Sequence, residues 1–249
     1  MSKSKTNKLP WKMTNKRFVA FIDILGFKDL VMRSSHKDIY EQLFQISKTK
    51  QLIENLSDDK YFMADKGDSD TYILRFSDSI AIFSKTDDLA NFSYFLEVTN
   101  YLFSRAINCK IPLKGGIALG IVSLNKTEQI YFGQPIIDAF LIEGEVKYMG
   151  IVAHNSIDKY LFENKNKIEQ FQLNKILFEA KTPLKSGKIN HLNLNWFNII
   201  YTSPSNEEKI EFINSILKEF KCTVSGEPRI YLQNTVELFE ENKNAIIMK

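Results

Sequence analysis

Two short apolar runs in this chain each lead to a single aspartate, and this feature constrains the fold more than any other. Residues 18–22 run directly into Asp23, and Asp78 stands between residues 72–75 and 80–83. β-Branched and aromatic residues dominate the runs, which is typical of buried strands. A carboxylate beside a buried strand is costly unless a cation binds it. The sequence therefore predicts neighbouring strands whose aspartates share a site for hard divalent cations.

Apolar periodicity along the chain predicts an α+β fold with a ferredoxin-like core, in which helices cover one face of an antiparallel sheet. We expect a basic flexible tail over residues 1–16, the core over 17–155 and a C-terminal α/β extension packed on the core over 156–249. The charged segment 57–69 is expected to be a surface connection. Strands are predicted at residues 18–22, 72–75, 80–83, 113–122, 150–153 and 196–201, and helices at 39–46, 89–106, 135–143 and 205–220.

The net charge of +3 arises near the N-terminus, because six of the 33 Lys and Arg residues lie within residues 1–17, which hold no acidic residue. The rest of the chain is slightly acidic, so we expect a solvated arm and no nucleic-acid or membrane partner. No run approaches the ~18 apolar residues of a membrane span. Cys109 and Cys222 lack metal-ligand spacing, and a cytoplasmic protein is expected.

Four motifs together resemble the class III nucleotidyl cyclases over roughly residues 17–155. Asp23-Ile-Leu-Gly-Phe27 matches the family's first aspartate with its Gly-Phe, and Phe76-Ser-Asp78 matches the second, with Ser77 in place of the usual glycine. The strand Leu113–Gly120 and the run from Tyr131-Phe-Gly133 to Glu143 complete the likeness. Each motif is weak alone, and their order and spacing carry the resemblance.

The resemblance implies cyclisation of a nucleoside triphosphate at a two-metal site. Asp23 and Asp78 would ligate two Mg²⁺ or Mn²⁺ ions, with the carbonyl of Ile24 as a further ligand. Backbone N–H groups around Gly26 and Phe27, at a helix N-terminus, would receive the triphosphate. Members of the family work as homodimers whose sites lie between subunits, and a homodimer is expected here.

Departures from the family pattern imply a pyrimidine substrate. The family's adenine-selecting lysine and its partner aspartate fall on Leu74 and Ile130, and the asparagine and arginine that assist the transition state fall on Ile137 and Leu141. This pattern is similar to the pyrimidine cyclases of bacterial Pycsar antiphage systems, whose cyclic UMP or cyclic CMP acts on a separate effector protein. The resemblance implies UTP as the substrate, with CTP as the alternative.

Several residue roles stay open at this point. Tyr72 and Arg75 could read the pyrimidine edge or could make structural contacts, and Lys114 could bind the triphosphate or be an ordinary strand lysine. Asp23 alone could be a helix cap, and Asp78 alone a turn residue.

Two rival functions also stay open. One is a purine cyclase whose base is read by unusual residues, and the other is a catalytically silent module that binds a nucleotide. Two retained aspartates argue against the silent module, because binding a base requires no paired metal carboxylates. The absence of the family's asparagine and arginine is compatible with the silent module.

Overall fold

The computed structural model describes residues 10–55, 70–171, 173–198, 205–224 and 226–247. The predicted surface connection at 57–69 and residues 1–9 of the predicted tail lie outside this description. The elements, in chain order, are β1 (Thr14–Ile24), α1 (Phe27–Arg33), α2 (His36–Asn55), β2 (Thr71–Phe76), β3 (Ser79–Ser84), α3 (Leu89–Asn108), β4 (Leu113–Asn125), β5 (Ile130–Phe132), α4 (Gln134–Glu145), β6 (Ile151–Ala153), α5 (Asn155–Glu163), α6 (Lys165–Ile168), β7 (Leu177–Leu184), β8 (Gly187–Leu194), α7 (Asn206–Thr223) and α8 (Pro228–Ile247), with short 3₁₀ turns at Glu169–Phe171, Leu173–Lys175 and Trp196–Asn198.

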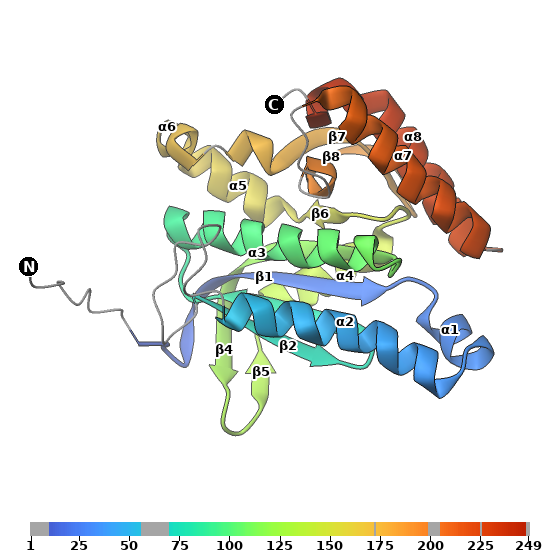
Figure 1. The fold of residues 1–249 in the computed structure, drawn as a ribbon. Coiled ribbons are helices and arrows are strands. Elements are labelled where there is room, and N and C mark those ends of the chain that lie inside the picture. The colour runs from blue at the N-terminus through green and yellow to red at the C-terminus, as the bar shows by residue number, and fades with distance from the viewer. Residues whose placement is uncertain (1–9, 56–69, 172, 199–204, 225, 248–249) are drawn as a thin grey trace, which may run out of the picture.

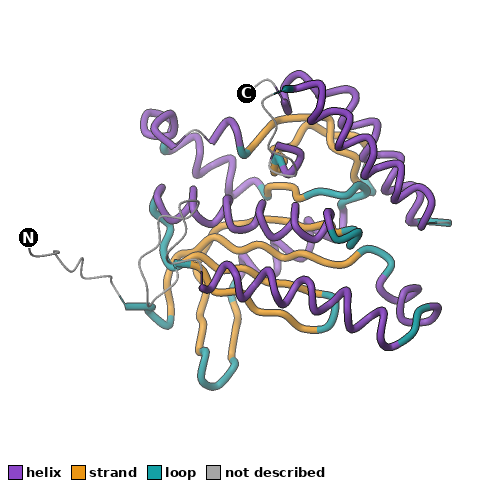
Figure 2. The backbone as a smooth tube through the Cα atoms, in the orientation of Figure 1, coloured by secondary structure: helices purple, strands orange, loops and turns teal. Residues whose placement is uncertain are grey.

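Within the described residues, the strands form one eight-stranded sheet in the order β2-β3-β1-β4-β6-β8-β7, with β5 paired to β4 off this path. Figure 2 shows these strands running between the helices. The predicted α+β fold with a helix-covered sheet is confirmed. One detail differs, because β4 and β6 are parallel while the other neighbours are antiparallel. Strands β7 and β8 extend the same sheet beyond β6.

The prediction that helices cover only one face of the sheet is wrong. Phe18 and Ile22 of β1 join the cluster that contains α2 and α3, whereas Val19 packs with Ala139 of α4. Figure 1 shows α2 and α3 in front of the sheet and α4 behind it. A strand that is apolar on both faces needs cover on both. Gly116 of β4 allows α4 to approach, since a Cβ there would overlap the Ala139 carbonyl.

Strand β1 begins at Thr14, so it overlaps the last three residues of the basic tail predicted over residues 1–16. Arg17 is completely buried, and its Nη atoms donate to the backbone carbonyls of Ser84, Lys85 and Lys12. Residues 14–16 thus belong to the sheet, and the Arg17 charge is part of the core and does not lie on a solvated arm.

Local signals in the sequence located the central elements. The hairpin of β2 and β3 forms as predicted, with Asp78 in its turn. The acidic pair before α3 ends at Asp88, whose side chain caps the helix by accepting from the N–H of Asn91 at 2.9 Å. Ser205 caps α7 in the same way.

The strand predicted at residues 196–201 is wrong over 196–198, which form a 3₁₀ turn, and 199–201 lie outside the described residues. Trp196 and Phe197 are completely buried, and their rings stack at 3.9 Å between centroids. A short apolar run fits either a buried strand or a buried turn. Strands β5, β7 and β8 and helices α5 and α8 were not predicted.

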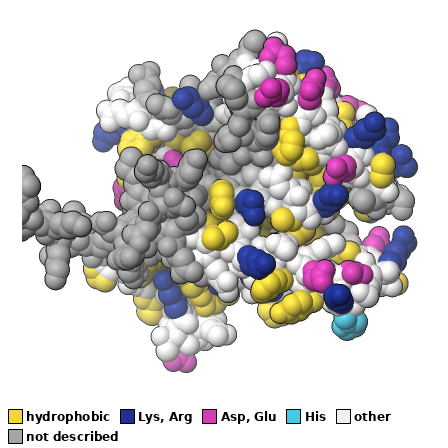
Figure 3. Space-filling view, viewed as in Figure 1, with side chains coloured by type: hydrophobic (Ala, Val, Ile, Leu, Met, Phe, Trp, Pro, Cys, Tyr) yellow, Lys and Arg dark blue, Asp and Glu magenta, His cyan; other side chains and the backbone are white. Residues whose placement is uncertain are grey.

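None of the described helices is long and apolar enough to span a bilayer. On the face shown in Figure 3, basic and acidic side chains are interspersed.

Candidate functional site

Asp23 lies near the C-terminal end of β1, in the middle of the sheet. It stands opposite Ser79 on β3 and Lys114 on β4. The N–H of Ile24 donates to the carbonyl of Asp78 at 3.3 Å, so the turn between β2 and β3 is tied to the end of β1. The structure thus brings together the two aspartates that the sequence singled out.

The surroundings of Asp23 disfavour its negative charge. Burial, followed by the nearby Asp78 and Glu143 carboxylates, raises its pKa from 3.8 to about 6, while the Lys114 ammonium acts in the opposite direction. The Ser79 hydroxyl lies 3.5 Å from its Oδ1. Neighbouring carboxylates repel one another, and a bound divalent cation relieves that repulsion.

The turn that carries Asp78 has an unusual backbone at Ser77, with φ of 54°. This left-handed conformation is the one that glycine adopts readily and that costs other residues about 1 kcal/mol or more. Ser77 stands where the cyclase pattern has glycine. The chain therefore keeps a glycine-like turn shape with a serine in it, and the placement of Asp78 depends on that shape.

Lys114 is engaged by a residue of its own chain. Its ammonium lies 2.6 Å from Oε1 of Glu143 on α4 and 3.0 Å from the Glu143 carbonyl, and both side chains are buried. These contacts engage two of the three N–H donors of the ammonium, so the predicted role of Lys114 in binding the triphosphate would use the third. In the sequence, Glu143 is part of a motif but has no assigned role. Its contact with Lys114 depends on how α4 packs over β4, which the structure reveals.

The two candidate base readers do not lie beside the aspartates of the same chain. Arg75 points to the opposite face of the sheet, where its Nη1 donates to the Leu43 carbonyl of α2 at 2.6 Å. Tyr72 shares the face of Asp23, but it is paired through Phe83 with Val19, four residues before Asp23. Its hydroxyl contacts the Tyr131 hydroxyl at 3.0 Å.

Gly26 and Phe27 form the junction between β1 and α1. Gly26 has φ of 71° and precedes the first turn of the helix, and Phe27 packs against the core. A hollow of about 330 Å³ adjoins this junction and is lined by Asp23, Gly26 and Lys114. The same hollow is also lined by residues that the sequence analysis did not single out: Leu25, Asp29, Arg33, Gly226, Glu227, Pro228 and Tyr231.

The donor set suits a hard cation that keeps part of its shell for water or phosphate. Two carboxylates and the carbonyl of Ile24 are oxygen ligands, which Mg²⁺ and Mn²⁺ prefer. Among the described residues, no cluster of three or more His, Cys, Asp or Glu side chains is placed to enclose a metal ion. The predicted ligands Asp23, Ile24 and Asp78 supply oxygen donors of the kind that such a cation binds.

No family model and no curated protein matches this sequence. Among solved structures, the chain resembles the catalytic core of a rhodopsin-guanylyl cyclase with converted specificity, in complex with ATPαS, at a TM-score of 0.50 and 14% identity over 74% of this chain and 96% of that one. A class III adenylyl cyclase-like ATP-binding protein from Pseudomonas aeruginosa aligns at a TM-score of 0.41 and 14% identity, over 59% of this chain and 35% of that one.

These likenesses concern the fold. The helix-covered sheet of this chain has a fold similar to that of the rhodopsin-guanylyl cyclase catalytic core.

Proposed function

We propose that this protein is a metal-dependent nucleotide cyclase that converts UTP to 3′,5′-cyclic UMP and pyrophosphate. The observation that carries the proposal is the meeting of Asp23 and Asp78 at the centre of a cyclase-type sheet, where burial and neighbouring carboxylates raise the pKa of Asp23 to about 6. Maintaining such repulsion is costly to a fold unless a bound cation offsets it.

In the reaction, the ribose O3′ forms a bond to the α-phosphorus, the bond from that phosphorus to the bridging oxygen breaks, and pyrophosphate leaves with that oxygen. The hydroxyl proton passes to water. Asp23, Asp78 and the carbonyl of Ile24 would hold two Mg²⁺ or Mn²⁺ ions, which when bound would supply Lewis acidity toward the hydroxyl and the phosphates. Backbone N–H groups around Gly26 and Phe27 orient the triphosphate beside the end of β1.

The pyrimidine assignment is supported by the apolar residues at the two base-reading positions of the family. Leu74 is half-buried, and Ile130 is 52% exposed. Neither side chain can make the polar contacts that select adenine, and a site without those contacts loses its means of favouring ATP. UTP is placed before CTP on the resemblance to Pycsar cyclases alone.

A homodimer is part of the proposal. On α4, the helix that covers the face of Asp23, the side chains of Ile137, Phe140 and Leu141 are each more than half exposed. Adjacent exposed apolar side chains favour burial against a partner, and a second copy would place its own residues near the first copy's site. Ile137→Glu or Leu141→Glu should give monomers by light scattering, and a fully active monomeric wild type would contradict this part.

The signalling role rests on the same resemblance. A cyclic nucleotide made by this protein in the bacterial cytoplasm would act on a separate effector protein in antiphage defence.

A silent nucleotide-binding module is the second candidate. Apolar Ile137 and Leu141 occupy the positions of the assisting asparagine and arginine, and Lys114 is paired with Glu143. Both observations are compatible with binding without turnover.

One experiment separates these functions. The purified protein is incubated with the four ribonucleoside triphosphates and Mg²⁺ or Mn²⁺, and products are identified by mass spectrometry. Cyclic UMP or cyclic CMP is expected, and it should disappear in Asp23→Ala and Asp78→Ala but persist in Asp38→Ala, an exposed aspartate on α2. Dominant cyclic AMP or cyclic GMP would overturn the pyrimidine assignment, and binding without any product would favour the silent module.

A further inference from the structure

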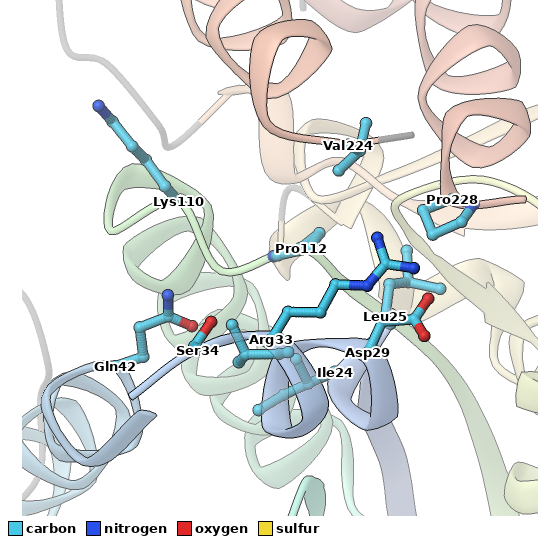
Figure 4. A pocket seen from close by; sticks show the side chains of 12 residues that line it. Ile24, Leu25, Asp29, Arg33, Ser34, Gln42, Lys110, Pro112, Val224 and Pro228 are labelled. Carbon is cyan, nitrogen blue, oxygen red and sulfur yellow. The ribbon is translucent and has the colours of Figure 1, made fainter. Parts of the chain in front are cut away.

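The hollow beside Asp23 continues past α1 into a second lobe. The first lobe measures about 330 Å³ and the second about 240 Å³, and Gly26, Arg33 and Pro228 line both. The second lobe is shown in Figure 4, where the Arg33 side chain extends from α1 toward Pro228. Arg33 therefore stands between the two lobes, next to the junction that follows Asp23.

Charges around the first lobe are largely paired within the protein. Lys114 is bound to Glu143, and Glu227 is bound to Lys147 at 2.9 Å. By contrast, no carboxylate of the described residues lies within ion-pair distance of the Arg33 guanidinium. Among the described residues that line this lobe, Arg33 is thus the cation whose charge is not already engaged.

The far wall of the hollow comes from the C-terminal end of the chain. Pro228, the first residue of α8, lies beside Gly26: a Cβ at Gly26 would be in ordinary van der Waals contact with its ring, at 3.6 Å. The Lys147 ammonium, which binds Glu227, also lies 4.9 Å from the ring centre of Tyr231 on α8. These contacts fix the start of α8 against the core, directly across the hollow from α1.

The mixed charge of the lining indicates the chemistry of its ligand. Arg33 offers a planar fork of donors that suits phosphate oxygens. The carboxylates of Asp23 and Asp29 line the same lobe, and they would repel a bare anion. A polyphosphate that carries a divalent cation satisfies both kinds of side chain.

From this arrangement we infer that Arg33 binds the terminal phosphates of a metal-bound polyphosphate in a hollow whose far wall is formed by residues 226–228 and Tyr231. The inference rests on the proposed function in taking the polyphosphate to be the tail of the nucleoside triphosphate. It adds that the C-terminal segment is part of the substrate site, and that Arg33 acts as a binding residue there.

The test measures binding directly and needs no turnover. Magnesium pyrophosphate is titrated into the full-length protein by calorimetry, and the wild type is compared with Arg33→Gln and Arg33→Lys. Lys28→Gln is the matched control, since Lys28 is an exposed cation on the same helix that lines neither lobe. Loss of a charged hydrogen-bonding partner should weaken binding about tenfold or more in Arg33→Gln. Arg33→Lys should recover part of the affinity, and Lys28→Gln should bind nearly as the wild type does.

Hydrogen exchange gives an independent measurement of the wall. Magnesium pyrophosphate should slow exchange in peptides covering residues 226–231 of the wild type, and this protection should be lost in Arg33→Gln. Unchanged exchange there, or equal affinities for Arg33→Gln and Lys28→Gln, would overturn the inference even if cyclic UMP is made. Arg33-dependent binding in a protein that makes no cyclic nucleotide would support the inference and refute the proposed function.

Discussion

Each end of β1 carries a charged side chain, and the surroundings of these two charges differ. Near its start, Arg17 is completely buried, and three backbone carbonyls accept from its guanidinium. Near its end, Asp23 is half-buried and faces two further carboxylates, Asp78 and Glu143, with Lys114 as the opposing charge. The Nη donors of Arg17 are thus satisfied within the protein, although its buried Nε has no hydrogen-bond partner, whereas the charge of Asp23 is left in need of a ligand. This difference separates a structural charge from a candidate functional one in the same strand.

The largest effect is expected from breaking the ion pair at the Asp23 end. Lys114→Met leaves the buried Glu143 carboxylate uncompensated, and the loss of unfolding free energy should be about 3–5 kcal/mol. The double variant Lys114→Met/Glu143→Leu removes both charges and should recover most of that loss. Urea unfolding of the three proteins checks this, and equal losses in the single and double variants would show that packing, not charge, dominates.

The next largest loss of stability is expected from removing the charge of Arg17. Arg17→Ala deletes a buried side chain and removes its donors to the Ser84 and Lys85 carbonyls, of which the Lys85 carbonyl keeps the Asn15 amide at 3.2 Å. We therefore expect a loss of about 3 kcal/mol. Lys16→Ala is the control, because Lys16 is half-exposed in its ion pair with Asp87, and it should lose less than about 1 kcal/mol. Comparable losses in both variants would contradict a structural role for Arg17.

Removing the charge of Asp23 should have the opposite sign, raising the free energy of unfolding. Because the folded-state pKa of Asp23 is raised from 3.8 to about 6, folding is most stable when Asp23 is protonated, and stability falls as the pH rises through this window. Asp23→Asn avoids this penalty and should stabilise the metal-free protein by about 1–2 kcal/mol at pH 8, allowing for its partial exposure. The gain should vanish near pH 3, and thermal unfolding at both pH values measures it. A destabilised Asp23→Asn at pH 8 would contradict this account.

The smallest effect concerns the turn that brings Asp78 to Asp23. Ser77→Gly relieves the left-handed strain at φ of 54° and should stabilise the protein by up to about 1 kcal/mol, partly offset by the greater freedom of glycine in the unfolded chain. Ser77→Val should be destabilising. Differential scanning calorimetry measures both, and a neutral Ser77→Val would mean that the turn relaxes without cost.

Sequence reasoning succeeded where the signal was local. Asp23 and Asp78 could be paired because each sits beside a recognisable strand and the second lies in a tight turn. The sequence alone could not place Arg75 on a face of the sheet, because neighbouring residues of a strand point to opposite faces and a shift of one position exchanges Leu74 and Arg75. Its role as a base reader stays a prediction. The contact of Lys114 with Glu143 could not be foreseen, because it depends on how α4 lies over the sheet.

The C-terminal half was harder to predict for a physical reason. Strand β8 is exposed along residues 187–190 and carries no alternating apolar pattern, so its sequence resembles a surface loop. Arg33 and Pro228 line one hollow although they are far apart in sequence, and no spacing rule connects them. Such positions become visible only from the folded chain.

Strand β6 has a consequence for dividing this chain into parts. Its three residues pair with β4 on one side and, through Val152 and Asn193, with β8 on the other. A shortened protein that ends after α5 would present β6 and the neighbouring stretch of β4 as a bare, apolar sheet edge, which is a template for pairing with other chains. Attempts to produce the first 160 or so residues alone should therefore yield aggregates, and expression trials should keep the C-terminal segment attached.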